Sequence, residues 1–380
     1  MNKSIFVICS LVLTVFATSF MGNAQVTLNA DGPGNTYELI NSVFAPSGNV
    51  IETPDLMPDG SHSAFGRHIA EVFDTDLNKY VFEFYAHLDT GAYGITDNDI
   101  STLSNDRQRI EIKAYGSSPS NLKGTLGETV TYKWKFKIPI GFKPSANFTH
   151  IHQIKPVDGD DSNPIFTLTA RKGTPNRMQL IYVVDENGRN DYKTEISLSL
   201  FEGIWVDVVE VIKIGTGTSG SYSILVKKVS DGTVLMTYSN NSIQTIRTAA
   251  TDPNIPQVAN SFIRPKWGIY RSLLDVASLR DDSIRFSDFS IAEGTLSTNQ
   301  KFLENEIFLS PNPVRDILTV SEKTVALFSK ICIYDANGKQ VLNQKIDTNS
   351  IDISFLPAGM YFVKLSNTQM VSEPVKVIKF

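Results

Sequence analysis

The sequence predicts an all-β protein: a β-jelly roll of two packed antiparallel sheets, followed by a small β-sandwich module. Most segments between residues 25 and 293 alternate polar and apolar side chains, and clusters of Gly, Asn, Asp and Pro separate them. We find no amphipathic helix of ordinary length in the sequence. The alternating segments include residues 79–88, 109–115, 129–138, 164–171, 178–184, 205–214, 221–229 and 284–292. Such alternation is typical of strands with one buried face, which pair into sandwiches.

Residues 129–138, TVTYKWKFKI, show the pattern most clearly. Tyr132, Trp134 and Phe136 fall on one face of the strand, and three lysines fall on the other. A half-buried strand with a solvated lysine face is the favoured interpretation. The alternative is a basic stripe beside a groove.

Composition limits the classes of partner. The 380 residues are 41% hydrophobic and 10% aromatic, enough for one large β domain and a small one, or for two mid-sized domains. The net charge of −5 gives no overall positive field, so we expect no nucleic-acid partner. Attraction for an anionic ligand must then come from locally placed Arg and Lys. We expect a monomer.

Residues 1–24 have the features of a secretory signal peptide. Lys3 supplies the charged start, residues 5–20 are mostly apolar, and the small residues at 22–24 suit cleavage after Ala24. We find no further segment long and apolar enough to cross a bilayer, so we expect no transmembrane segment. Cys9 falls in the signal peptide and Cys332 is the other cysteine. This excludes an internal disulfide and a cysteine-based metal site in the mature protein.

The candidate functional stretch is residues 148–155, FTHIHQIK. If it is a strand, Gln153 and Lys155 share one face, and His150 and His152 share the other with Phe148. Burying an amide and an amine without partners is costly, so we expect Gln153 and Lys155 to face a groove. Residues 106–113 (DRQRIEIK) and 263–270 (IRPKWGIY) have the same mixed character. We predict that the three stretches line one concave cationic surface made for a polymeric anion.

The three stretches supply the groups that β-elimination on a uronic-acid polymer needs. That reaction requires neutralisation of the uronate carboxylate, a base for the C5 proton and an acid for the leaving oxygen. Alternation places Arg107, Arg109, Glu111 and Lys113 on one face, and Lys266, Gly268 and Tyr270 on another. Arginine and glutamine suit neutralisation, Lys, His or Tyr can act as base, and Tyr can act as acid. Gly268 would let a sugar approach the backbone.

At these residues the chain resembles the jelly-roll polysaccharide lyases. The matching motifs are RQRIE, Gln153-Ile154-Lys155 and the stretch from Lys266 to Tyr270. Lysine stands where alginate lyases carry histidine, which points to the related ulvan lyases first and glucuronan lyases next. The resemblance implies a secreted endo-acting lyase that uses Lys155 as base and Tyr270 as acid. It also implies that Arg109 and Gln153 neutralise the carboxylate.

Further substrate contacts and alternatives stay open at this point. Arg107, Glu111, Lys266 and His152 complete the predicted substrate-binding set. His152 would replace Lys155 as base if a bulge changed the alternation. The alternative functions are an alginate lyase, a glycoside hydrolase of the same sandwich class and a non-catalytic carbohydrate-binding protein.

We expect no required cofactor or metal. The acidic loop at residues 157–164 could hold a structural calcium ion, although a solvated turn is favoured. His68 and His87 lie in no recognised zinc spacing.

The composition becomes polar after residue 293, and we place a linker at residues 294–305 and a module at 306–380. SPNP, YDANGK, LPAGMYFVKL and the basic-apolar end of this module resemble the C-terminal sorting domain of the type IX secretion system of Bacteroidetes. The resemblance implies that the secretion machinery is a partner and that the protein is exported. Release and surface attachment both remain open.

Overall fold

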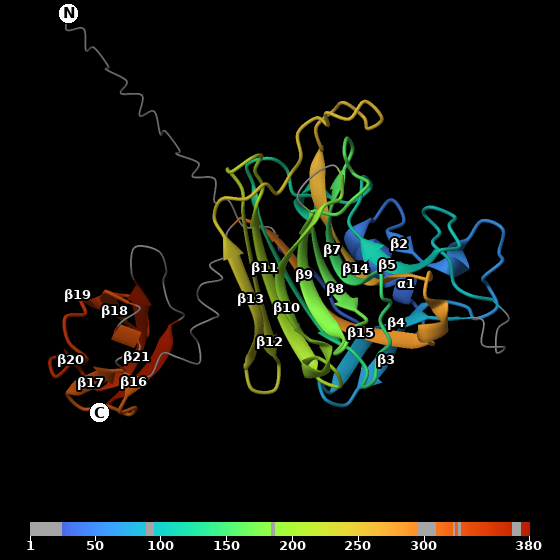
Figure 1. The fold of residues 1–380 in the computed structure, drawn as a ribbon. Coiled ribbons are helices and arrows are strands. Elements are labelled where there is room, and N and C mark those ends of the chain that lie inside the picture. Colours follow the sequence, from blue (N-terminus) through green and yellow to red (C-terminus); the bar gives the residue numbers. More distant parts are fainter. Residues whose placement is uncertain are drawn as a thin grey trace, which may run out of the picture. The chain divides into compact units, whose positions relative to one another are not determined.

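The computed structural model, drawn in Figure 1, describes residues 25–88, 95–183, 187–294, 309–321, 324–325, 328–366 and 374–380. The predicted signal peptide, and most of the predicted linker, lie outside the described residues. The chain forms two compact units: the larger comprises the residues up to Glu293 except Thr129–Thr131, and the smaller comprises Gly294–Phe380 together with Thr129–Thr131. Each is described by itself.

The larger unit consists of two antiparallel sheets, which confirms the predicted all-β fold. Sheet A has the order β13-β12-β11-β6-β15-β4-β3, with β1 beside β15. Its strands are β1 (Gln25–Leu28), β3 (Ile69–Asp74), β4 (Lys79–Ala86), β6 (Thr129–Lys137), β11 (Trp205–Lys213), β12 (Ser221–Lys228), β13 (Val234–Asn240) and β15 (Asp282–Glu293). Sheet B has the order β10-β9-β8-β7-β14-β5-β2. Its strands are β2 (Ile51–Glu52), β5 (Arg107–Lys113), β7 (Thr149–Val157), β8 (Phe166–Arg171), β9 (Arg177–Val183), β10 (Asn190–Ser197) and β14 (Phe262–Ser272).

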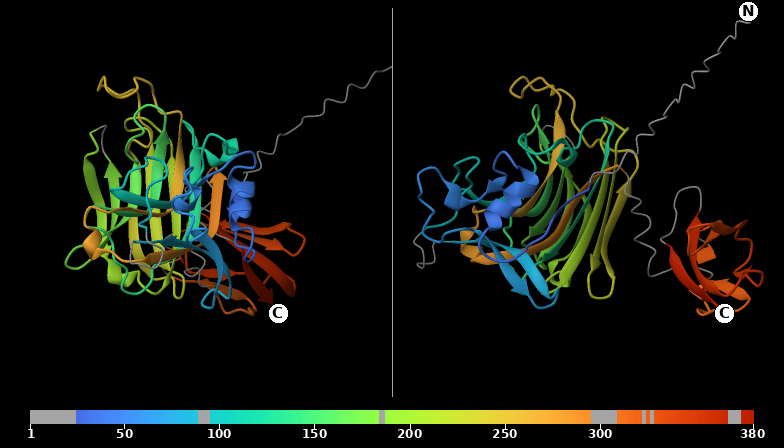
Figure 2. Two further views of the ribbon diagram at one scale, coloured as in Figure 1. Left: turned by 90° about the vertical axis from the view of Figure 1, so that its right-hand side faces the viewer. Right: turned by 180° about the vertical axis from the view of Figure 1, so that it is seen from behind.

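The two sheets pack face to face around an aromatic core, and Figure 2 shows them from two further directions. Trp134 of β6 is fully buried, and its ring centroid lies 5.0 Å from that of His152 of β7. The lysines of β6 face the other way, where Lys135 pairs with Asp288 at 2.7 Å. Since β6 belongs to sheet A and the three candidate stretches to sheet B, the half-buried strand interpretation of residues 129–138 is the better one.

Helical structure is sparse in the described residues. The helix α1 (Thr36–Phe44) buries Tyr37, Ile40 and Phe44 along one side, and Phe44 stacks on Trp267 at 6.1 Å between ring centroids. The sequence pattern missed this helix because it spans only nine residues. The 3-10 turns are η1 (Pro54–Leu56), η2 (Ser120–Leu122), η3 (Leu198–Leu200) and η4 (Val276–Ser278). None of the described helices has the length and apolar character needed to span a membrane.

The three candidate stretches form neighbouring strands of sheet B, with β14 between β7 and β5 (Figure 1). Tyr270 therefore lies opposite Arg109 on one side and opposite His150 on the other. Gly268 has a φ of 147°, and a Cβ added there would lie 2.0 Å from the carbonyl oxygen of Ile110. The glycine thus allows β5 to approach β14, rather than a sugar to approach the backbone as the sequence suggested.

A β-bulge in β7 changes which histidine faces the groove. The register of β7 shifts between His150 and His152 against β8, and the matching shift against β14 falls between Trp267 and Tyr270. One extra residue reverses the alternation on its far side. His150 consequently shares a face with Gln153 and Lys155, which strict alternation placed on the opposite face.

The smaller unit contains two small antiparallel sheets. Their strands are β16 (Leu309–Ser310), β17 (Ile317–Val320) and β20 (Ser350–Asp352) in one, and β19 (Gln340–Lys345), β18 (Lys330–Asp335), β21 (Gly359–Ser366) and β22 (Val375–Lys379) in the other. Leu318, Ile331, Val363 and Leu365 are fully buried in its core. Cys332 is a free thiol, as the sequence predicted.

Candidate active site

A cavity of about 280 Å³ lies on the face of sheet B that is turned away from sheet A. Its lining comes from strands of sheet B and the segments beside them: Arg107, Arg109, Asn147, Phe148, His150, Gln153, Lys155, Ser162, Asn163, Pro164, Thr167, Arg171, Ile181, Val183, Gly188, Asn190 and Tyr270. Five of the eight predicted site residues are in this set. They are Arg107, Arg109, Gln153, Lys155 and Tyr270, from three strands that are distant in sequence.

Tyr270 lies between two arginines. The guanidinium of Arg109 sits 3.7 Å from the centre of the phenol ring, and Arg107 Nη1 donates a hydrogen bond to the phenol oxygen at 3.1 Å. Burial raises the pKa of Tyr270, and the two arginines only partly oppose that effect. The phenol therefore keeps its proton at neutral pH and can act as a proton donor.

Lys155 is half-buried at the end of the cavity near the loop that follows β7. Its Nζ donates hydrogen bonds to the backbone carbonyl oxygens of Asp161 and, at 2.8 Å, of Ser162. Burial, and then the positive charge of Lys266, lower the pKa of Lys155 to about 7, while Asp161 acts in the opposite direction. A substantial fraction of this amine is neutral near pH 7, which is the form that accepts a proton.

Glu111 is a buried anion that organises three of the predicted residues. It accepts hydrogen bonds from Arg109 Nη1 at 2.6 Å and from Gln153 Nε2 at 2.5 Å, and it pairs with Lys266 Nζ at 2.8 Å. Lys266 also pairs with Glu52 of β2 at 2.5 Å and is only 2% exposed. Glu111 and Lys266 were predicted to bind substrate, but neither lines the cavity. They lie below its surface and hold Arg109 and Gln153 in place.

Arg109 is held from two sides. Asp99 accepts hydrogen bonds from Nε at 2.8 Å and from Nη2 at 3.0 Å, and Glu111 binds the remaining edge of the guanidinium. Asp99 comes from the segment before β5, so pattern analysis of the strands did not identify it. The guanidinium of Arg109, held by these two carboxylates, packs against the ring of Tyr270 and fixes its position.

His150 and Arg171 are cavity residues that the sequence analysis did not select. His150 Nδ1 lies 2.7 Å from Thr169 Oγ1, and its ring centroid lies 5.9 Å from that of Tyr270. Burial, and then the charge of Arg171, lower the pKa of His150 to about 3, so its imidazole is neutral. Arg171 donates to Gln179 Oε1 at 2.8 Å and to the Ala146 carbonyl at 3.2 Å. In the described part of the chain, Arg171 forms no ion pair with a carboxylate. Its positive charge is therefore available to a bound anion.

His152 lies in the core between the sheets, on the side away from the cavity. Its Nε2 is 2.7 Å from Glu210 Oε2, and Nδ1 is 2.9 Å from the Lys266 carbonyl oxygen. Glu210 in turn accepts a hydrogen bond from the Tyr222 hydroxyl at 2.6 Å. The bulge that turns His150 outward leaves His152 inside, so the alternative in which His152 acts as base does not fit this geometry.

The acidic loop after β7 uses its side chains within the protein. Asp158 accepts a hydrogen bond from Ser261, and Asp160 pairs with Arg247 at 3.3 Å. The carboxylates of these two residues thus bind different protein groups. The solvated turn stays the favoured interpretation of this loop, and a calcium site stays the alternative.

Comparison with known proteins identifies the smaller unit. Residues 308–379 match the family model described as "Secretion system C-terminal sorting domain". The protein therefore carries the sorting signal that the sequence predicted, which indicates secretion across the outer membrane. No curated protein sequence matches the chain.

Several solved structures are similar to the chain at low identity. Endo-β-1,4-glucuronan lyase from the fungus Trichoderma reesei is 16% identical with a TM-score of 0.40, over 59% of this chain and 86% of that one. The PL-14 alginate lyase from Aplysia kurodai is 12% identical with a TM-score of 0.40, and the match covers 70% of this chain and 97% of that one. Alginate lyase A1-II′ of polysaccharide lyase family 7 is 13% identical with a TM-score of 0.39, and the match covers 65% of this chain and 94% of that one. The activities in these descriptions belong to those proteins.

Proposed function

We propose that the larger unit is a polysaccharide lyase that cleaves a uronate-containing polymer by β-elimination. The observation that carries this proposal is the charge of the cavity lining. Its ionisable groups are Arg107, Arg109, Arg171, Lys155, His150 and Tyr270, and no described residue of the lining is a carboxylate. Such a lining attracts an anionic sugar and supplies both a proton acceptor and a proton donor.

The same observation disfavours a glycoside hydrolase. Hydrolysis of a glycosidic bond commonly uses two carboxyl groups that flank the bond. Asp207 and Glu210 are the carboxylates whose spacing on one strand comes nearest to that of a jelly-roll glycosidase. They lie on β11 of sheet A, and Glu210 is buried and accepts a hydrogen bond from Tyr222. A hydrolase would therefore need a site elsewhere on the molecule.

The proposed reaction follows from the groups at the cavity. Gln153 and the arginines neutralise the uronate carboxylate, which makes the C5 proton more acidic. Neutral Lys155 takes that proton, the C5–H electron pair forms the C4=C5 double bond, and the C4–O bond breaks. The leaving oxygen takes its proton from Tyr270. The products are an unsaturated uronate end and a new reducing end.

We place ulvan first among the substrates, glucuronan second, and alginate as the alternative. The cavity offers guanidinium donors besides Arg109, because Arg107, which pairs with Asp106 at 2.6 Å, and Arg171 both lie in its lining. Surplus cationic donors suit a polymer that carries sulfate as well as uronate. Alginate and glucuronan present carboxylates alone.

A screen of ulvan, glucuronan, alginate and pectin tests the proposal. The ultraviolet absorbance of an unsaturated uronate should rise with ulvan, and more slowly with glucuronan. New reducing ends without that absorbance would show a hydrolase. Binding without cleavage of any polymer would show a carbohydrate-binding protein instead.

A further inference from the structure

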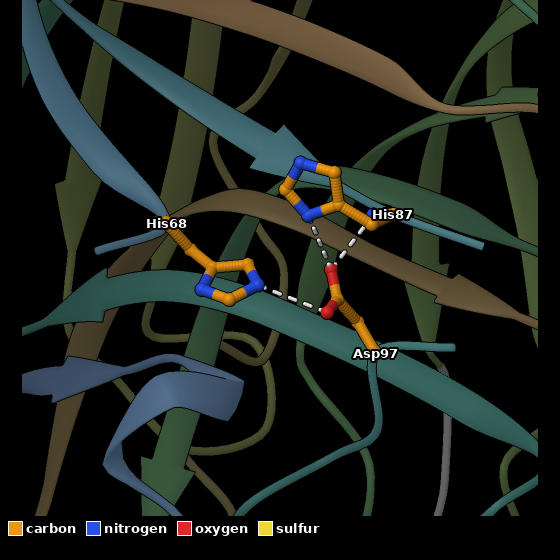
Figure 3. A group of neighbouring side chains, drawn as sticks. All are labelled: His68, His87 and Asp97. Carbon is orange, nitrogen blue, oxygen red and sulfur yellow. Dashed lines mark hydrogen bonds and ion pairs between the residues drawn. The ribbon is translucent and has the colours of Figure 1, made fainter. Parts of the chain in front are cut away.

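A second group of chemically active side chains lies outside the cavity, and Figure 3 shows it. His68 comes immediately before β3, His87 comes immediately after β4, and Asp97 lies in the segment before β5. Their candidate ligand atoms all lie within 4.8 Å of one another. The exposed fractions are 0% for His68, 6% for His87 and 2% for Asp97. From this group we propose that His68, His87 and Asp97 bind one divalent metal ion of the zinc type.

Each imidazole nitrogen lies at a distance from the Asp97 carboxylate that suits two ligands of one zinc ion. His68 Nε2 lies 2.9 Å from Asp97 Oδ1, and His87 Nδ1 lies 3.1 Å from Asp97 Oδ2, so both imidazoles turn toward one carboxylate (Figure 3). Zinc binds imidazole nitrogen and carboxylate oxygen at about 2.0–2.2 Å, which puts adjacent donors roughly 3 Å apart. Two imidazole nitrogens and one oxygen of Asp97 make three protein ligands, and a water molecule would fill the fourth position of a tetrahedral zinc ion. Two imidazoles favour zinc over calcium or magnesium, which prefer oxygen ligands.

The surroundings of the group match those of a metal site. His68 Nδ1 lies 2.8 Å from Asp55 Oδ1, an arrangement that fixes the ring and leaves Nε2 to face Asp97. Metal-binding histidines usually make such an outer contact with a carboxylate. The ring centroid of Phe65 lies 3.7 Å from that of His87 and 5.2 Å from that of His68. The phenyl ring therefore shields both imidazoles from water.

Charge balance also favours a cation here. Asp55 and Asp97 are two carboxylates in a buried setting, and in the described part of the chain their ion pairs go to histidines. A buried anion needs a compensating charge. A divalent ion neutralises both carboxylates. The competing account is a metal-free network in which His68 is protonated. Burial lowers the pKa of His68, but its hydrogen bonds to Asp55 and Asp97 outweigh that effect and raise the pKa to about 9.

The pairing of β3 with β4 explains why His68 and His87 show no zinc-site spacing along the chain. The antiparallel ladder joins the start of β3 to the end of β4, and the Tyr85 N–H donates to the His68 carbonyl at 2.9 Å. His68 and His87 are thereby neighbours in space. Zinc-site motifs are defined by short spacings along the chain, so they do not contain a pair that strand pairing brings together.

The metal would also stabilise the segment that positions Arg109. Asp97 lies two residues before Asp99, which holds the Arg109 guanidinium, and the Arg109 N–H donates to the Asn98 carbonyl at 3.3 Å. Fixing Asp97 therefore fixes the support of Arg109 and, through it, of Tyr270. This link to catalysis rests on the proposed function, whereas metal binding does not.

Metal analysis of the full chain tests the proposal. After incubation with zinc and removal of excess, the wild-type protein should retain one zinc per chain, and cobalt should give the intense visible spectrum of a four-coordinate site. His87→Ala and Asp97→Asn should lose both signals. Asp55→Asn should bind zinc about 10–100-fold more weakly. His62→Ala is the matched control, since His62 is buried beside the same segment, with Nε2 3.1 Å from the Thr96 carbonyl.

The wild-type protein alone decides the question if the variants do not fold. Zinc should raise its melting temperature and a chelator should lower it. A wild-type protein without stoichiometric zinc or cobalt, or with His87→Ala retaining both, would overturn the proposal in favour of the ion-pair network. Metal binding without cleavage of any uronate polymer would leave this proposal standing and remove only the proposed function.

Discussion

Cleavage should slow steeply as the pH falls below about 7, because the proposed base, Lys155, is then protonated. Burial beside Lys266 lowers the pKa of Lys155 to about 7. A base acts in its deprotonated form, and below its pKa that fraction falls about tenfold for each pH unit. At two units below the pKa, kcat/KM should therefore be about a hundredfold below its plateau. The pKa of Tyr270 is raised, so the proton donor stays competent on the alkaline side.

The assay is the initial rate of ultraviolet absorbance at low substrate concentration and constant ionic strength. Lys155→Ala should lose turnover while its melting temperature stays near that of the wild type. Lys228→Ala, on β12 of sheet A, is the matched lysine control and should keep the wild-type profile. A profile that stays flat into the acid range would refute Lys155 as base. It would instead indicate His150, whose pKa of about 3 keeps it neutral there.

Three further variants separate chemistry, support and specificity. Tyr270→Phe should lower kcat by roughly 10²–10⁴-fold while circular dichroism stays unchanged, because only the proton donor is lost; a wild-type rate would contradict its role. Glu111→Gln should lower the free energy of unfolding by about 3–5 kcal/mol in denaturant titrations, because Arg109 and Lys266 each lose a buried negative partner. An unchanged midpoint would show that other groups balance these two buried positive charges. Arg171→Ala should raise KM for ulvan more than for glucuronan if this arginine binds sulfate. Equal changes in KM would assign it to the uronate carboxylate.

Strand alternation was enough to predict the fold and the convergence of three distant stretches. Arg107, Arg109, Gln153, Lys155 and Tyr270 line one cavity because each lies on the same face of sheet B. That face could be read from the sequence, since polar residues at every second position of an otherwise apolar strand require a polar environment.

Other features depend on contacts that alternation does not contain. Which of His150 and His152 faces the cavity is decided by a bulge, and nothing in FTHIHQIK marks its position. Alternation also gives the face of a residue but not its depth, so Lys266 appeared to reach substrate although Glu52 of β2 covers it. The grouping of His68, His87 and Asp97 arises from strand pairing and from a segment of irregular structure.

Proton nuclear magnetic resonance of an ulvan digest tests the central claim most directly. If the cationic cavity of sheet B carries out β-elimination, the wild-type protein should produce the vinylic H4 signal of an unsaturated uronate, in step with new reducing ends. Tyr270→Phe should produce neither. Reducing ends that accumulate without the vinylic signal, or a vinylic signal undiminished in Tyr270→Phe, would contradict the account.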